Sequence, residues 1–175
     1  MKSFELQPHL SGDLVQIRPM KKEEFEPLYA VASDPLIWEL HPEKERYRRD
    51  IFQKYFDGAI QSAGAVVIED KNGNIIGASR YYDCNFHQSQ ITIGYTFLGR
   101  KYWGGQFNLE VKKLMLNHAF KFVDRVIFEI GEKNLRSRRA IEKIGAKMIQ
   151  GKSFGKGDQV IYQMTREEFQ RNLHV

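Results

Sequence analysis

The stretch ITIGYTFLGRKYWGGQFN, residues 91–108, decides the fold of this chain. Its first half is rich in β-branched and aromatic residues, which predicts a strand. A short basic loop with glycines follows, and apolar residues then recur at helical spacing from Leu109 to Phe120, which predicts a helix. The first N–H groups of a helix lack internal partners and carry partial positive charge, so a strand–loop–helix unit of this kind is an anion site. Arg100 and Lys101 add full positive charges beside it.

Composition predicts one globular domain over residues 1–175. The chain has 42% apolar and 13% aromatic residues, which is typical of a folded domain of this length. Its formal charge of +5 suits a phosphate-rich ligand. Basic and acidic residues nevertheless alternate, as in residues 21–24 and 43–46, which is typical of solvated helix faces. A nucleic-acid binder is therefore the weaker interpretation, and we expect no specific nucleic acid as partner.

Cysteine and histidine usage narrows the chemistry and the compartment. The single cysteine, Cys84, excludes an internal disulfide and favours a cytoplasmic location. The five histidines contain no pair at helical i, i+4 spacing, so we expect no metal. No apolar window has the length of a membrane span and the start of the chain is unlike a signal peptide, so we expect no membrane. The oligomeric state is left as monomer or homodimer.

The order of predicted elements indicates a mixed α/β (α+β) domain. Turn and cap signals, including Asn72-Gly73 between two apolar runs, separate the elements. The predicted strands are 14–18, 65–69, 75–82, 91–98, 125–130, 146–150 and 159–164. The predicted helices are 21–33, 43–61, about 107–122, 134–144 and a short one after Thr165.

Two motifs carry a family resemblance. The first is Gly94-Tyr95-x-Phe97-Leu98 followed by Tyr102-Trp103-Gly104-x-x-Phe107-Asn108, and the second is Asn134-x-x-Ser137-x-x-Ala140-x-x-Lys143-x-Gly145. Either motif alone is weak, but both in this order resemble the GNAT superfamily of N-acetyltransferases, and more narrowly its branch of ribosomal-protein N-terminal acetyltransferases. The resemblance extends from about Leu14 to Thr165. It implies the GNAT-like acyl-CoA N-acyltransferase fold, whose mostly antiparallel central sheet is splayed in the middle and flanked by helices.

The resemblance also implies acetyl-CoA as donor and direct transfer of acetyl to an amine. Two strands that splay apart would expose backbone groups to the pantetheine arm, and Asn134 would bond to the same arm with Ser137 near it. The loop and helix start would hold the pyrophosphate. The implied cofactor-binding residues are Phe97, Leu98, Arg100, Lys101, Trp103, Gly104, Gly105, Gln106, Phe107, Asn108, Asn134 and Ser137. Simpler roles stay open: Gly104 and Gly105 also suit a plain turn, and Asn134 also suits a helix N-cap.

This chain departs from the family pattern at several positions. Gln106 stands where a Gly or Ala normally lets phosphate approach the backbone, and Ala146 replaces the usual Phe after Gly145. Thr92 stands where family members often carry a Glu, and a threonine cannot act as a base at neutral pH. Freeing a lysine ε-amine of pKa about 10.4 at pH 7 costs roughly 4.6 kcal/mol, whereas an α-amine near 7.8 costs about 1.1 kcal/mol. The missing Glu therefore favours an acceptor amine of low pKa.

The candidate catalytic residues are Glu129, Tyr162 and Ser137. Glu129 is a candidate base, although the strand pattern does not show which way it faces. Tyr162 is a candidate acid for the leaving thiolate, or an ordinary strand aromatic. We expect the acceptor pocket around the loop 38–42, the second helix and the turn 153–158. The alternative function is a catalytically impaired acyl-CoA-binding module of the same fold.

Overall fold

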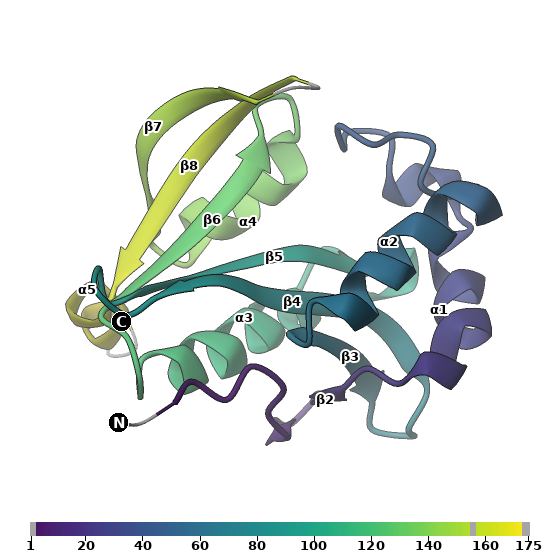
Figure 1. The fold of residues 1–175 in the computed structure, drawn as a ribbon, viewed down its shortest axis with the longest axis horizontal. Coiled ribbons are helices and arrows are strands. Elements are labelled where there is room, and N and C mark those ends of the chain that lie inside the picture. Colours follow the sequence, from purple (N-terminus) through teal and green to yellow (C-terminus); the bar gives the residue numbers. More distant parts are fainter. Residues whose placement is uncertain (1–2, 155–156, 173–175) are drawn as a thin grey trace.

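One mixed sheet runs through the molecule and determines the position of every other element. The computed structural model describes residues 3–154 and 157–172, with side chains for 3–149 and 158–172. Its sheet is 8-stranded in the order β1-β2-β3-β4-β5-β6-β8-β7 (Figure 1). The strands are β1 (Leu10–Ser11), β2 (Val15–Pro19), β3 (Ala65–Asp70), β4 (Ile75–Asn85), β5 (Gln90–Leu98), β6 (Arg125–Gly131), β7 (Lys147–Phe154) and β8 (Gly157–Thr165).

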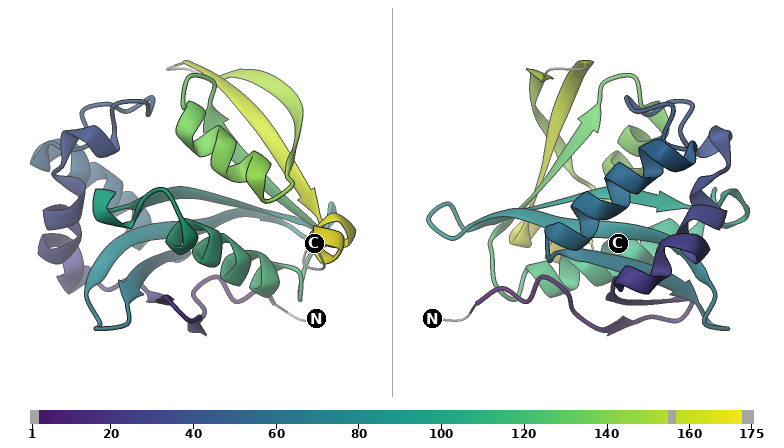
Figure 2. Two further views of the ribbon diagram at one scale, coloured as in Figure 1. Left: turned by 180° about the vertical axis from the view of Figure 1, so that it is seen from behind. Right: turned by 45° about the vertical axis from the view of Figure 1, so that its right-hand side comes forward.

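Helices cover both faces of this sheet, as Figure 2 shows from two further sides. The α-helices are α1 (Phe25–Ala32), α2 (Arg49–Gln61), α3 (Gln106–Ala119), α4 (Leu135–Lys143) and α5 (Arg166–Asn172). Short 3-10 turns are η1 (Lys22–Glu24), η2 (Pro35–Ile37) and η3 (Arg100–Tyr102). The mixed α/β GNAT-like architecture that the sequence predicted is therefore confirmed.

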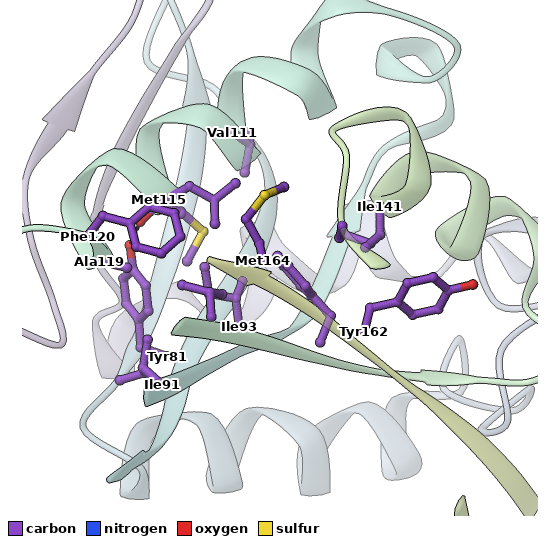
Figure 3. Packing of buried hydrophobic residues seen from close by; sticks show 14 of the residues in the cluster. Tyr81, Ile91, Ile93, Val111, Met115, Ala119, Phe120, Ile141, Tyr162 and Met164 are labelled. Carbon is purple, nitrogen blue, oxygen red and sulfur yellow. Dashed lines mark hydrogen bonds between the residues drawn. The ribbon is translucent and has the colours of Figure 1, made fainter. Parts of the chain in front are cut away.

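Alternation along the strands produces two separate cores. One core joins β5 and β6 to α3 and α4, and includes Ile91, Ile93, Val111, Met115 and Ile141 (Figure 3). The other core lies on the opposite face under α1 and α2, and includes Phe52, Tyr55, Val67, Ala78 and Phe97. Each core buries apolar surface against its own face of the sheet, which is what stabilises the layered fold.

The sheet opens between β5 and β6. These parallel strands pair only at Gln90↔Arg125, Ile91↔Val126 and Thr92↔Ile127. Beyond Thr92 they diverge, and β6 continues with β8 and β7 away from β5 (Figure 1). A register shift between β4 and β5 coincides with Tyr95, whose φ of 54° is unusual for a residue other than glycine. The diverging edges expose backbone groups of both strands to a ligand.

The helix predicted from Glu43 to Gln61 starts later than expected. Residues 43–48 form turns, and α2 begins at Arg49. The reason is tertiary: Arg46 turns inward and its guanidinium lies over the rings of Trp38 and Tyr55, contacts that local charge patterning does not reveal. The first predicted helix likewise divides into η1 and α1.

Candidate active site

The glycine loop before α3, which the sequence predicts as a phosphate cradle, is open. Gly104 adopts a φ of 75°, which favours glycine, and Gly105 is the N-cap of α3. Apart from the glycine itself and its neighbours in the chain, no described atom lies within 4 Å of where a Cβ would stand at either glycine. Glycine has no side chain to cap the helix, so the N–H groups at the start of α3 face open space. Gln106, the first residue of α3, is exposed at this end.

The two basic residues before this loop differ in their surroundings. Arg100 forms an ion pair with Asp34, and this contact lowers the pKa of the Asp34 carboxyl. The ammonium group of Lys101 lies 4.8 Å from the centre of the Tyr102 ring, and a hydrogen bond to Tyr102 raises the pKa of Lys101. Both side chains are exposed. Lys101 is the cation beside the cradle without a described ion pair, whereas the Arg100 charge is shared with Asp34.

Aromatic residues fix the loop against the body of the protein. The Trp103 indole donates a hydrogen bond of 2.9 Å to the Leu98 carbonyl. The Phe107 and Tyr102 rings lie 5.0 Å apart, centre to centre. The side chains of Phe97 and Leu98 are buried in the two cores, so what they offer a ligand is their backbone. Asn108 lies in the first turn of α3, half-buried.

The start of α4 supplies a second set of polar groups at the far end of the opening. Asn134 is the N-cap of α4, and its Oδ1 accepts a hydrogen bond of 3.3 Å from the backbone N–H of Ser137. Arg136 extends from the same turn to lie 3.9 Å from the Trp103 ring centre and donates a 2.9 Å hydrogen bond to Glu39. The predicted loop 38–42, the glycine loop and α4 therefore meet around the opening.

Glu129 lies beside the point where the strands separate. The alternating residues Val126, Phe128 and Ile130 all belong to the core under α3 and α4, so Glu129 faces the opposite side of the sheet. It is half-buried there, and its negative charge helps to raise the pKa of Tyr82 after the larger effect of burial. Thr92, 3% exposed, is the last residue of β5 that pairs with β6. The structure thus resolves the orientation that the sequence left open.

Tyr162 lies on the other face, toward α4. Its hydroxyl donates a 2.5 Å hydrogen bond to Glu142 Oε1 and accepts one of 3.0 Å from Arg138 Nε. Figure 3 shows its ring beside Ile141 of α4. Burial and the bond to Glu142 raise the pKa of the phenol. Because this proton is already donated to Glu142, the role of Tyr162 as an acid stays a prediction.

Lys112 and two buried arginines were missed by sequence reasoning. The Lys112 ammonium group on α3 donates a 3.0 Å hydrogen bond to Thr96 Oγ1 and lies 5.6 Å from the centre of the Phe128 ring. Its contacts therefore reach from β5 to β6, and burial lowers its pKa to about 8. Arg46 and Arg80 lie on the α2 face. A charged residue within the apolar run 75–82 was the available signal for Arg80.

Comparison with known proteins agrees with this geometry. Residues 15–147 match the family model of the acetyltransferase (GNAT) domain. The chain belongs to the GNAT acetyltransferase family. No curated protein sequence matches it significantly. Solved structures share the fold at low identity, so they support the architecture alone.

Three of these structures illustrate the range of the GNAT fold. A GCN5-related N-acetyltransferase from Brucella melitensis is 19% identical with a TM-score of 0.82, over 96% of this chain and 85% of that one. RimJ from Mycobacterium smegmatis, in complex with CoA-disulfide, is 16% identical with a TM-score of 0.71, over 93% and 88%. Spermidine N-acetyltransferase from Vibrio cholerae, in complex with CoA and spermine, is 13% identical with a TM-score of 0.71, over 91% and 99%.

Among the described residues, no group of three or more His, Cys, Asp or Glu is arranged to hold a metal ion. None of the helices in this part of the chain is long and apolar enough to span a membrane.

Proposed function

We propose that this GNAT family member transfers acetyl from acetyl-CoA directly to an amine. The observation that carries the proposal is the end of β5–β6 pairing at Thr92 and Ile127, which leaves backbone groups for a pantetheine arm. The uncapped start of α3, with Gly104 and Gly105, would hold the pyrophosphate. CoA is bound in the neighbours from M. smegmatis and V. cholerae, which adds support for this donor.

The residues of this chain would divide the chemistry between the two faces of the sheet. The amine nitrogen attacks the thioester carbonyl carbon, the C–S bond breaks, the ammonium proton leaves and the thiolate takes up a proton. Glu129 would accept the ammonium proton, because its carboxylate faces the α2 side just past the last β5–β6 pair. Ser137, in the first turn of α4, would donate to the thiolate, with Tyr162 as the other candidate acid.

The acceptor amine is proposed to have a low pKa, as in a protein N-terminal α-amine or a small-molecule amine of similarly low pKa. Glu129 is the one carboxylate that we assign to proton removal, and a lysine ε-amine is harder to deprotonate by roughly 3.5 kcal/mol at pH 7. Neighbours of this fold include a RimJ and a spermidine N-acetyltransferase, so the fold itself does not select the amine.

Calorimetry and a thiol-release assay test this proposal together. We expect acetyl-CoA to bind, and CoA thiol to be released only when an amine is present, with α-amino peptides preferred to lysine peptides. Asn134→Ala should weaken CoA binding, whereas Asn117→Ala, at an exposed position of α3, should not. Glu129→Gln should lower kcat by about 100-fold, the effect of losing a general base. Binding without thiol release on any amine would favour the impaired binding module instead.

A further inference from the structure

Two arginine side chains are buried beside the opening, on the face of the sheet that α2 covers. Arg80 of β4 is 7% exposed, and Arg46 in the turns before α2 is 9% exposed. Both guanidinium groups lie against Tyr55, at 5.7 and 5.0 Å from its ring centre. Burying a cation is costly unless an opposite charge or full hydrogen bonding compensates it, so the partners of these two groups decide what the site can do.

The hydrogen-bonding capacity of Arg80 is only partly used. One terminal nitrogen donates to the Tyr55 carbonyl at 3.4 Å, a long contact. The guanidinium carbon lies 3.9 Å from the ring centre of Tyr95, the bulged residue of β5. Arg80 Nε is buried without a hydrogen-bond partner. Arginine has five N–H donors in a planar fork, so several of them remain for a ligand.

Arg46 is similarly short of an acceptor. Its terminal nitrogen lies 3.3 Å from His41 Nε2. His41 Nδ1 already accepts a 2.9 Å hydrogen bond from the Glu43 N–H, and burial lowers the pKa of His41 to about 3, which keeps the ring neutral. A neutral imidazole has one acceptor nitrogen, so Nε2 carries the hydrogen and offers Arg46 no lone pair.

No described ion pair includes Arg46 or Arg80. Burial and the positive charge of Arg80 lower the pKa of Arg46, and the charge of Glu43 opposes this effect. Glu129 and Asp83 are the acidic groups whose charges act on the neighbouring Tyr82. Arg46 and Arg80 therefore place two buried, incompletely hydrogen-bonded cations together, and an added anion would be attracted to them.

The site formed by Arg46 and Arg80 is distinct from the predicted phosphate cradle. The cradle begins α3, whose core residues Val111 and Met115 pack on one face of the sheet. Tyr55, which contacts both arginines, belongs to the core on the other face. Glu129, the proposed base, faces the same side as the arginines. An acceptor whose amine lies near Glu129 thus has the two guanidinium groups within its own binding region, not within that of the donor.

We propose that Arg46 and Arg80 bind an anionic group, carboxylate or phosphate, carried by the acceptor amine. The inference rests on the proposed function, because it names the acceptor class for the same site. It predicts an acceptor that combines an amine of low pKa, placed toward Glu129, with an anionic group on the arginine fork, such as a short peptide with a free α-amine and a carboxylate. Polyamines, which carry several positive charges, are disfavoured beside the two guanidinium groups.

Calorimetry on the protein saturated with CoA tests the subsite without requiring turnover. The probes are the dipeptide Ala-Ala against its C-terminal amide, and phosphoethanolamine against ethanolamine, since the members of each pair differ mainly in the anionic group. We expect the anionic member of at least one pair to bind about tenfold tighter, the effect of one charge-assisted hydrogen bond. The pair that discriminates identifies the group. Equal or tighter binding of both neutral members, or of spermidine, overturns the inference.

Variants connect the preference to the arginines. Arg80→Gln should abolish the discrimination and leave CoA affinity within about threefold, a difference below 1 kcal/mol. Arg80→Lys keeps the charge and should retain part of it. Arg49→Gln is the matched control, because Arg49 of α2 also lies over aromatic rings but is exposed and paired with Glu26. Selective binding without thiol release would contradict the proposed function and support the anion site. Thiol release without selectivity would support the proposed function and overturn the anion site.

Discussion

Replacing Lys112 by methionine should stabilise the protein, although it removes a hydrogen bond. Lys112 is 6% exposed, and burial lowers its pKa from 10.5 to about 8. Each pKa unit corresponds to 1.36 kcal/mol, so holding this ammonium group in the native state at pH 7 costs about 3 kcal/mol. Losing the bond to Thr96 Oγ1 costs about 1 kcal/mol, since Thr96 stays paired with Ser79. We expect Lys112→Met to raise the free energy of unfolding by about 2 kcal/mol at pH 7.

The sign of this effect depends on pH. Between pH 8 and 10.5 the unfolded chain binds more protons at Lys112 than the native protein does, so the stability of the natural protein rises with pH in that window. The advantage of the variant should therefore shrink above pH 8 and turn into a deficit of about 1 kcal/mol near pH 10.5, where only the lost hydrogen bond remains.

Urea unfolding followed by tryptophan fluorescence, at pH values from neutral to alkaline, measures both quantities. Lys113→Met is the matched control, because Lys113 is the exposed neighbour on α3 and its replacement should change little. A Lys112 variant that is destabilised at pH 7 by the same amount as at pH 10 would refute the reasoning. Such a result would mean that the buried ammonium group is stabilised by its surroundings.

Three further changes probe the loop, the acceptor side and the hydroxyl on β8. Gly104→Ala should lower the free energy of unfolding, measured in urea, by about 1 kcal/mol, because a side chain is strained at a φ of 75°. Gly105→Ala, at an extended φ of −164°, should lower it less. Equal losses would contradict the strain argument. His41→Asn should move the midpoint of acid unfolding, followed by circular dichroism, to lower pH. The lowered pKa of His41 makes the natural protein lose stability as pH falls from 6.5 toward about 3, and the variant lacks this loss. An unchanged midpoint would show that His41 is not responsible. Tyr162→Phe should lose about 1 kcal/mol of stability with kcat within about threefold, since its proton is held by Glu142; a 100-fold fall in kcat would establish Tyr162 as the acid.

The sequence by itself determined the order of elements and the position of the glycine loop. Local signals were sufficient there: Asn72-Gly73 closes the β3–β4 hairpin, Gly104 and Gly105 precede a helix at Gln106, and Asn134 begins α4. Each depends on the conformational preference of a residue and its immediate neighbours. The GNAT family assignment followed from the same residues and is confirmed by the match over residues 15–147.

The arrangement of the proposed acceptor side was decided only by the tertiary structure. The side of the sheet on which Glu129 lies is set because the alternate residues of β6 are buried in the core under α3 and α4. Tyr162 lies on the opposite side from Glu129 and donates a hydrogen bond to Glu142 of α4. Arg46, Arg80 and Tyr55 are far apart in the chain, and packing of the turns before α2 over β4 and β5 brings them together. A charged side chain becomes buried only when several segments that are distant in sequence pack around it. Neither the pKa of Lys112 nor the unpaired arginines could therefore be obtained from sequence spacing.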